Sequence, residues 1–161
     1  MSKLSTVSTL LSRVFFGLTL IAPIAIGLMG WLSFTAIHVD PPQGSLFASE
    51  MDIVFGLIPL LITALCFWIL SQLFNRYAKG EYFTLSNIRD YRKLGFLLVI
   101  QVFFELLSTL YTDVFLTTSD QVIVNISDIH FDRLLIGAIV LCISWVFEQA
   151  RKIEEENKMT I

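Results

Sequence analysis

The feature that most constrains this chain is a series of long apolar runs with almost no charge. They extend over residues 14–36, 53–74 and 94–115. Each is long enough for a helix that crosses the hydrocarbon core of a membrane, which takes about 20 residues at about 1.5 Å per residue. Only helices and closed barrels satisfy every backbone polar group in lipid, and apolar runs of this length indicate helices.

A fourth run, residues 134–147, is short for a crossing. We predict a span over residues 131–150, because Arg133, Glu148 and Arg151 can extend toward the headgroups. A re-entrant or interfacial helix is the alternative. The predicted fold class is therefore an all-α integral membrane protein, a bundle of four transmembrane helices.

Composition supports one membrane domain over residues 1–161. Hydrophobic residues make up 55% of the chain and charged residues only 16%, whereas a soluble domain carries about 25% charged residues. The run at residues 14–36 is also too long for the apolar core of a signal peptide, and no small-residue cleavage site follows it. We therefore expect it to be a span.

The positive charges predict the orientation. With four spans, all of the chain's 11 Lys and Arg residues except Arg133 fall on one side. That side holds both termini and the connection 75–93, and the positive-inside rule makes it cytoplasmic. The connections 37–52 and 116–130 then lie outside. We expect a multi-pass protein of the bacterial inner membrane with cytoplasmic N- and C-termini.

The connection 75–93 shows helix-end signals. The second helix should continue through Ala78, and Gly80 can end it in the left-handed conformation. Thr84 is a good N-cap for a short cytoplasmic helix between spans two and three, and Phe83 and Ile88 stand where a hydrophobic staple would hold it. This helix carries three basic residues that form a surface near the inner leaflet, for anionic lipid or for a docking protein: Arg89, Arg92 and Lys93.

Several of these residues also form a recognisable pattern. The central part is Gly80-Glu81-Tyr82-Phe83-Thr84, Asn87-Ile88, Tyr91-Arg92 and Gly95, and the C-terminal part is Phe147, Ala150, Glu154-Glu155-Glu156 and Met159-Thr160-Ile161. The pattern resembles the bacterial domain of unknown function 2975 family over essentially the whole chain. The resemblance implies four spans, no assigned activity and no catalytic residues. Members are often encoded beside a small helix-turn-helix protein, which implies a cytoplasmic helix-turn-helix regulator as partner.

The third run carries one polar stripe. Gln101, Glu105, Ser108 and Thr112 recur every three or four positions and share one helix face. Glu105 falls near the middle of the run, where a carboxyl group should face the bundle interior or water. Since no Lys or Arg falls at its predicted depth, we expect a protonated carboxyl that hydrogen-bonds to Thr63 or Ser144. A proton or cation route, or a ligand contact, is the alternative.

The predicted outer connections carry histidines alternating with carboxylates. The residues are His38 and Asp40 in one connection, and Asp128, His130 and Asp132 in the other. Alternating positions share a face in an extended segment, and residues 122–127 are typical of a strand, so an external metal ion is one interpretation. Solvated acidic loops are the other, and we assign no metal.

The sequence argues against several functions. We find no nucleophile paired with a base and no phosphate-binding glycine loop, so we expect neither an enzyme nor a bound cofactor. The net charge of −3 argues against direct nucleic-acid binding. Two hypotheses remain, with a homo-oligomer left open in both. The first is a membrane-anchored regulatory protein that binds a cytoplasmic partner. The second is a small transporter, channel subunit or immunity-type protein that uses the stripe centred on Glu105.

Overall fold

The computed structural model describes residues 3–39, 46–115 and 131–159. Apart from residues 79–84, this part of the chain is helical, with helices α1 (Lys3–Val39), α2 (Leu46–Ala78), α3 (Leu85–Phe115) and α4 (Phe131–Met159). In the described chain, α1, α2 and α3 are long and apolar enough to cross a membrane. Four helices are thus confirmed within the described ranges, and a membrane crossing by the fourth stays a prediction.

The helices run past the ends of the predicted spans. Helix α1 continues to Val39 and α2 begins at Leu46, so most of the predicted connection 37–52 is helical, contrary to our prediction. The short helix expected before span three is not separate, because α3 runs unbroken from Leu85 into the apolar run. The physical reason is that a helix ends where a cap or breaker stops its hydrogen bonds, not where its side chains become polar.

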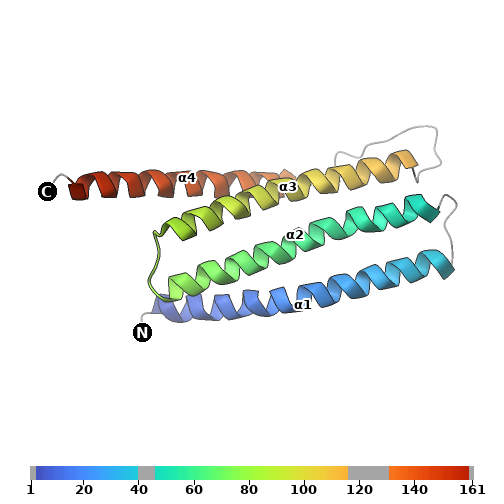
Figure 1. Cartoon of the computed structure of the whole chain (residues 1–161), viewed down its shortest axis with the longest axis horizontal. Helices are drawn as coiled ribbons and strands as arrows, with labels where there is room; N and C mark the ends of the chain where they lie inside the picture. Colours follow the sequence, from blue (N-terminus) through green and yellow to red (C-terminus); the bar gives the residue numbers. More distant parts are fainter. Residues whose placement is uncertain (1–2, 40–45, 116–130, 160–161) are drawn as a thin grey trace.

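The four helices form an open row in place of a closed bundle (Figure 1). Among the described residues, α1 contacts α2 alone, α2 contacts α3, and α4 contacts α3 alone. The apolar core therefore lies mainly between α2 and α3. Its buried members are Ile62, Cys66, Ile69 and Leu94, with Ile58, Leu70, Leu97, Phe104 and Val140 packed against them.

Small side chains join α1 to α2. The hydroxyl of Ser12 donates to the carbonyl of Ser71 at 3.0 Å, and the hydroxyl of Ser71 donates back to the carbonyl of Ser12 at 3.1 Å. Interhelical bonds of this kind are a common way for helices to associate in lipid. Further along, Gly30 lies against Leu57, whereas a Cβ added at Gly27 would meet no atom within 4 Å.

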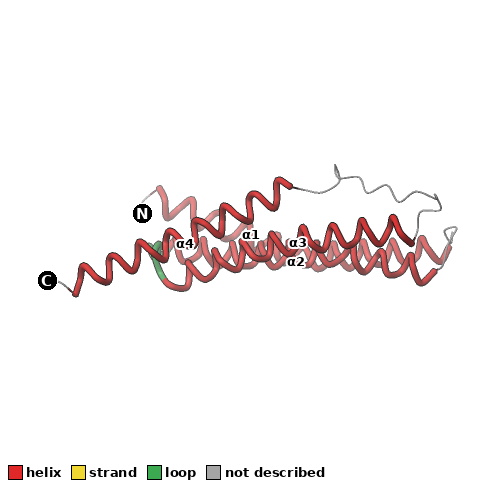
Figure 2. Tube along the Cα trace, turned by 90° about the horizontal axis from the view of Figure 1, so that it is seen from above, coloured by secondary structure: helices red, strands yellow, loops and turns green. Residues whose placement is uncertain are grey.

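Helix α4 is displaced along α3. It begins beside the middle of α3 and runs past the N-terminal end of α3 (Figures 1 and 2). The side chain of Arg133, in the first turn of α4, reaches Glu105, and α3 continues beyond Glu105 to Phe115, about 15 Å further. This displacement places Arg133 of α4 beside Glu105 of α3.

Candidate functional site: a capped connector and a polar groove

Residues 79–84, which we call the connector, join α2 to α3 in a tightly capped turn. Gly80 has φ +84°, and the amides of Gly80 and Glu81 donate to the carbonyls of Tyr77 and Arg76. These two bonds form a Schellman motif, which requires a left-handed residue and favours glycine. At the other end, Thr84 Oγ1 accepts from the amide of Asn87 at 3.3 Å. Both predicted caps are confirmed.

Asn87 holds the connector against α3. Its side chain is fully buried, and its Nδ2 donates to the carbonyls of Glu81 at 2.5 Å and Tyr82 at 2.9 Å. A buried amide bonded to two backbone carbonyls fixes the path of the segment that carries them, because neither carbonyl can reach water instead. Asn87 therefore stands in the pattern for a structural reason.

Two further contacts join α2 to α3 beside the connector. Arg76 forms an ion pair with Asp90, which is nearly buried, and the hydroxyls of Tyr77 and Tyr91 lie 2.7 Å apart. Each pair joins residues 14 positions apart in the chain, so both close a local loop at modest entropic cost. These two pairs were not predicted from the sequence.

Helix α4 is fixed to the same end by a close crossing of two glycines. A Cβ at Gly95 would lie 3.0 Å from the carbonyl oxygen of Gly137 and 2.6 Å from Leu141 Cγ. Glycine lets two helix backbones approach this closely. Nearby, the hydroxyl of Ser144, which is buried, donates to the carbonyl of Ile88 at 3.0 Å.

Aromatic rings complete this junction. The Phe147 ring of α4 packs edge-on against Phe83 of the connector at 5.4 Å and against Tyr91 of α3 at 5.6 Å between centroids. Residues of the sequence pattern thus meet here from the connector, α3 and α4. The central part of the pattern, together with Phe147 of its C-terminal part, therefore describes a structural junction.

The three predicted basic residues are exposed at this junction, but they differ in the ion pairs that they form. Arg92 forms an ion pair with Glu148 of α4, and Lys93 Nζ lies 3.9 Å from Asp90 Oδ1. Arg89 makes no ion pair with any residue in the described ranges. Arg92 therefore helps to hold α4, while Arg89 and Lys93 remain the exposed part of the predicted surface.

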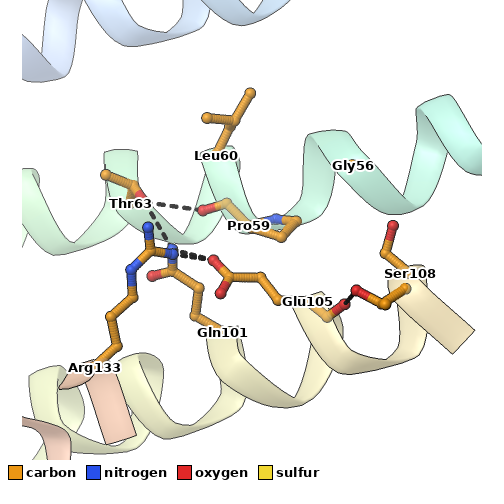
Figure 3. A pocket seen from close by; sticks show the side chains of 9 residues that line it. Gly56, Pro59, Leu60, Thr63, Gln101, Glu105, Ser108 and Arg133 are labelled. Atoms are coloured by element: carbon orange, nitrogen blue, oxygen red, sulfur yellow. Dashed lines mark hydrogen bonds and ion pairs between the residues drawn. The ribbon is translucent and has the colours of Figure 1, made fainter. Parts of the chain in front are cut away.

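The second site is an open polar groove of about 580 Å³ along α2 and α3 (Figure 3). Arg133 of α4 lies at one end of it. Its walls carry one carboxylate, one guanidinium, one amide and three hydroxyl groups, beside a glycine and a proline of α2. The lining residues are Gly56, Pro59, Leu60, Thr63, Gln101, Glu105, Ser108, Thr109 and Arg133.

Glu105 is paired, contrary to the prediction that it has no basic neighbour. Its Oε1 contacts Nη1 of Arg133, which lies 28 positions away in the chain. The Glu105 side chain is 19% exposed and that of Arg133 is 36% exposed. A full fourth span would place Arg133 at its outer end, but the displacement of α4 brings Arg133 level with Glu105 instead. The expected protonated carboxyl is thus replaced by an ion pair.

The other residues of the polar stripe lie only partly in the groove. Gln101 is buried, and its Nε2 donates to Thr63 Oγ1 at 3.3 Å and to Glu105 Oε1 at 3.2 Å. Ser108 also lines the groove, and Thr112 lies on α3 two turns beyond Glu105. Ser144, predicted as a partner of Glu105, bonds to Ile88 instead.

The predicted outer metal ligands fall largely outside the described residues, where Asp40, Asp128 and His130 stand. Of the other two, His38 Nδ1 lies 2.9 Å from the carbonyl oxygen of Phe34 on α1, and Asp132 lies in the first turn of α4. Within residues 3–39, 46–115 and 131–159, no group of three or more His, Cys, Asp or Glu side chains is placed to hold a metal ion.

Two missed residues left a signal in the sequence. Arg133 is the one basic residue that four equal spans would put on the outer side, and a lone charge beside an apolar run calls for a partner. Gly137 is a glycine near the start of the fourth run, as Gly95 is near the start of the third. Antiparallel helices meet near both of their starts only where one helix is displaced along the other, as α4 is along α3.

Together the row, the junction and the groove define a small protein whose described residues form four helices, the first three long and apolar enough to span a membrane. The model of the family described as "Protein of unknown function (DUF2975)" matches residues 51–161. This is more than half of the chain, which therefore belongs to that family, as the sequence pattern predicted. Neither the curated proteins nor the solved structures gave a match.

Proposed function

We propose that this protein is a membrane-anchored docking protein that binds a cytoplasmic protein. In this proposal the row is inserted in the bacterial inner membrane, and the junction and both termini face the cytoplasm. The support is the concentration of Lys and Arg residues at this end, which the positive-inside rule assigns to the cytoplasm.

The observation that carries the proposal is the projecting end of α4. Beyond Phe147 and Glu148, which contact the connector and α3, the helix continues to Met159, roughly 15 Å further. Its residues 152–157 are exposed. A helix held at its base by a glycine crossing, an aromatic cluster and an ion pair is a rigid element, and binding to it costs little conformational entropy.

The charge of this projection indicates the chemistry of the partner. Glu154, Glu155 and Glu156 are consecutive and exposed, and Ile153 is an exposed apolar residue beside them. The projection has no net charge, because Arg151, Lys152 and Lys158 balance the three glutamates, and Glu155 pairs with Arg151. The acidic character is confined to the local cluster of three glutamates, which is complementary to the basic surface with which DNA-binding proteins contact phosphates. A helix-turn-helix regulator, the partner implied by the family, carries such a surface, and docking would then compete with its binding to DNA.

The test is co-purification from membranes with the candidate regulator. Glu154→Gln, Glu155→Gln and Glu156→Gln together should abolish it while the row stays folded, since these side chains are exposed. A matched control is Glu81→Gln, an exposed carboxylate on the connector. Operator DNA should also displace the regulator from the wild-type protein. The absence of any regulator in repeated purifications would refute the proposal.

The basic residues give a second variant for the same experiment. Replacing Arg89 and Lys93 with Gln leaves the Arg92–Glu148 ion pair intact, so α4 stays in place. If this variant loses the partner and the triple glutamate variant keeps it, the docking surface lies on α3 and not on α4. Retention would indicate that the two residues contact lipid only.

The groove favours a second candidate function, transport of a proton or a cation. Glu105 is an ionisable group in a polar groove along apolar helices, which is where transporters place such groups. Glu105→Gln should then abolish flux into liposomes while leaving the protein folded. Normal flux, or a normal phenotype, with this variant would remove Glu105 as a titrating carrier.

A further inference from the structure

The groove contains an ion pair on a face of the row that the chain itself leaves open. Its lining comes from α2, α3 and Arg133 alone, and within the described chain α1 and α4 do not contact each other to close a bundle. Membrane proteins place ionisable side chains in the interior of a bundle, because lipid solvates them poorly. A single row has no such interior.

The ion pair is also incompletely satisfied within one chain. Arg133 engages Glu105 through Nη1 and Oε1, whereas Glu105 Oε2 is buried and has no hydrogen-bond partner among the described residues. A guanidinium carries five N–H donors. It can therefore donate two hydrogen bonds to one carboxylate, or bind two carboxylates at once. A partial rotation about the last side-chain bond of Glu105 would turn Oε2 toward the groove. A second guanidinium at the same depth would complete the site.

We propose that a second copy of this chain packs on this face, so that Arg133 of each copy also reaches Glu105 of the other. The inference rests on the membrane insertion proposed above and not on docking to a cytoplasmic protein. A two-fold axis along the membrane normal keeps both copies in the same orientation and brings residues of equal depth together. Because the two charges lie level with each other, the face is complementary to itself.

Gly56 provides a second reason for a helix at this face. It lines the groove, and a Cβ added to it would meet no atom within 4 Å. It therefore leaves space on the open side, unlike Gly95 and Gly137, whose space is filled within the chain. A small residue beside hydroxyl groups lets a neighbouring helix approach closely and form hydrogen bonds.

The first experiment is disulfide cross-linking of the full-length protein in native membranes. Cys66 and Cys142 are replaced with Ser, and Gly56→Cys, Leu60→Cys and Ser108→Cys are tested singly with a mild oxidant. At least one should give a covalent dimer, since residues close to a two-fold axis face their own copies. The control is Ile24→Cys, an exposed position on α1, which should stay monomeric.

The second experiment separates contacts between copies from contacts within one copy. Glu105→Arg and Arg133→Glu each place like charges on both sides of the interface, and neither should dimerise alone. Co-expressed with different tags, they should co-purify, because each interface contact then joins Arg to Glu although both internal pairs stay broken. The double variant in one chain restores the internal pair and should dimerise with itself.

Each outcome decides the proposal. Covalent dimers from the groove positions together with pairing of the two opposite variants would support it. A monomeric wild-type protein in nanodiscs, or cross-linking at Ile24 and at none of the groove positions, would overturn it. If the charge variants fail to fold, the cross-links decide alone. Dimerisation without partner binding would refute the docking function and leave this inference standing.

Discussion

The connector and the groove both hold polar side chains between α2 and α3, but they draw them from different distances along the chain. At the connector, Asn87 bonds to carbonyls 5 and 6 positions away, and Tyr77 meets Tyr91 14 positions away. In the groove, Gln101 meets Thr63 38 positions away and Arg133 meets Glu105 28 positions away. Local contacts follow from local sequence, whereas the groove depends on how whole helices are placed along one another.

The largest loss of stability is expected from a substitution that disrupts the packing of α4 against α3. Gly95→Leu should destabilise the protein by about 3 kcal/mol, at the upper end for overpacking, because a Cβ there already meets Leu141 Cγ at 2.6 Å and the backbone of Gly137 at 3.0 Å. The control is Gly17→Leu in α1, where a Cβ meets nothing within 4 Å. Thermal unfolding in detergent measures both. Equal stability of the two variants would contradict the glycine crossing.

The next largest loss of stability is expected from a substitution in the groove. Arg133→Gln should cost about 2 kcal/mol, because it leaves Glu105 without its counter-ion in a partly buried place; the figure is below that for a fully buried pair, since Arg133 is 36% exposed. Glu105→Gln combined with Arg133→Gln should recover most of the loss. The measurement is a double-mutant cycle of unfolding free energies. Additive effects of the two changes would show that the residues are not coupled.

A substitution at the connector should lower the stability somewhat less than one in the groove. Asn87→Ala removes the donor to two carbonyls in a buried site and should cost about 1–2 kcal/mol. The matched control is Asn75→Ala, at an exposed position on α2, which should change stability by less than about 0.5 kcal/mol. Protease cleavage within the connector should rise for Asn87→Ala only. An unchanged cleavage rate would mean that Asn87 does not hold this segment.

The smallest effect concerns the ion pair that joins α3 to the base of the projecting helix. Arg92→Gln should cost at most about 0.5 kcal/mol, because the pair with Glu148 is partly exposed, and the cost should fall as salt is raised. Arg89→Gln, which removes an exposed arginine of the same helix without that pair, is the control. A salt-independent loss for Arg92→Gln would show that it is more than a surface pair.

The difference between the two regions explains which predictions succeeded. The end of α2 at Ala78, the turn at Gly80 and the N-cap at Thr84 were predictable, because each depends on the conformation of a few adjacent residues. The polar stripe on α3 was predictable from its spacing. Its partners were not, since hydropathy predicts spans of equal depth and says nothing about how far one helix is displaced along another. That displacement explains why Arg133 was missed and why Ser144 was assigned to the wrong neighbour.

The displacement of α4 along α3 is the central claim, and cysteine cross-linking tests it most directly. A Cβ at Gly137 would lie 3.2 Å from Leu98 Cβ, close to the separation in a disulfide. With Cys66 and Cys142 replaced by Ser, the pair Leu98→Cys and Gly137→Cys should form a disulfide within one chain in native membranes. Thr109→Cys with Gly137→Cys, three turns further along the same face of α3, should not. A disulfide at 109 and none at 98 would show that α4 lies level with the other helices, and would contradict the displacement.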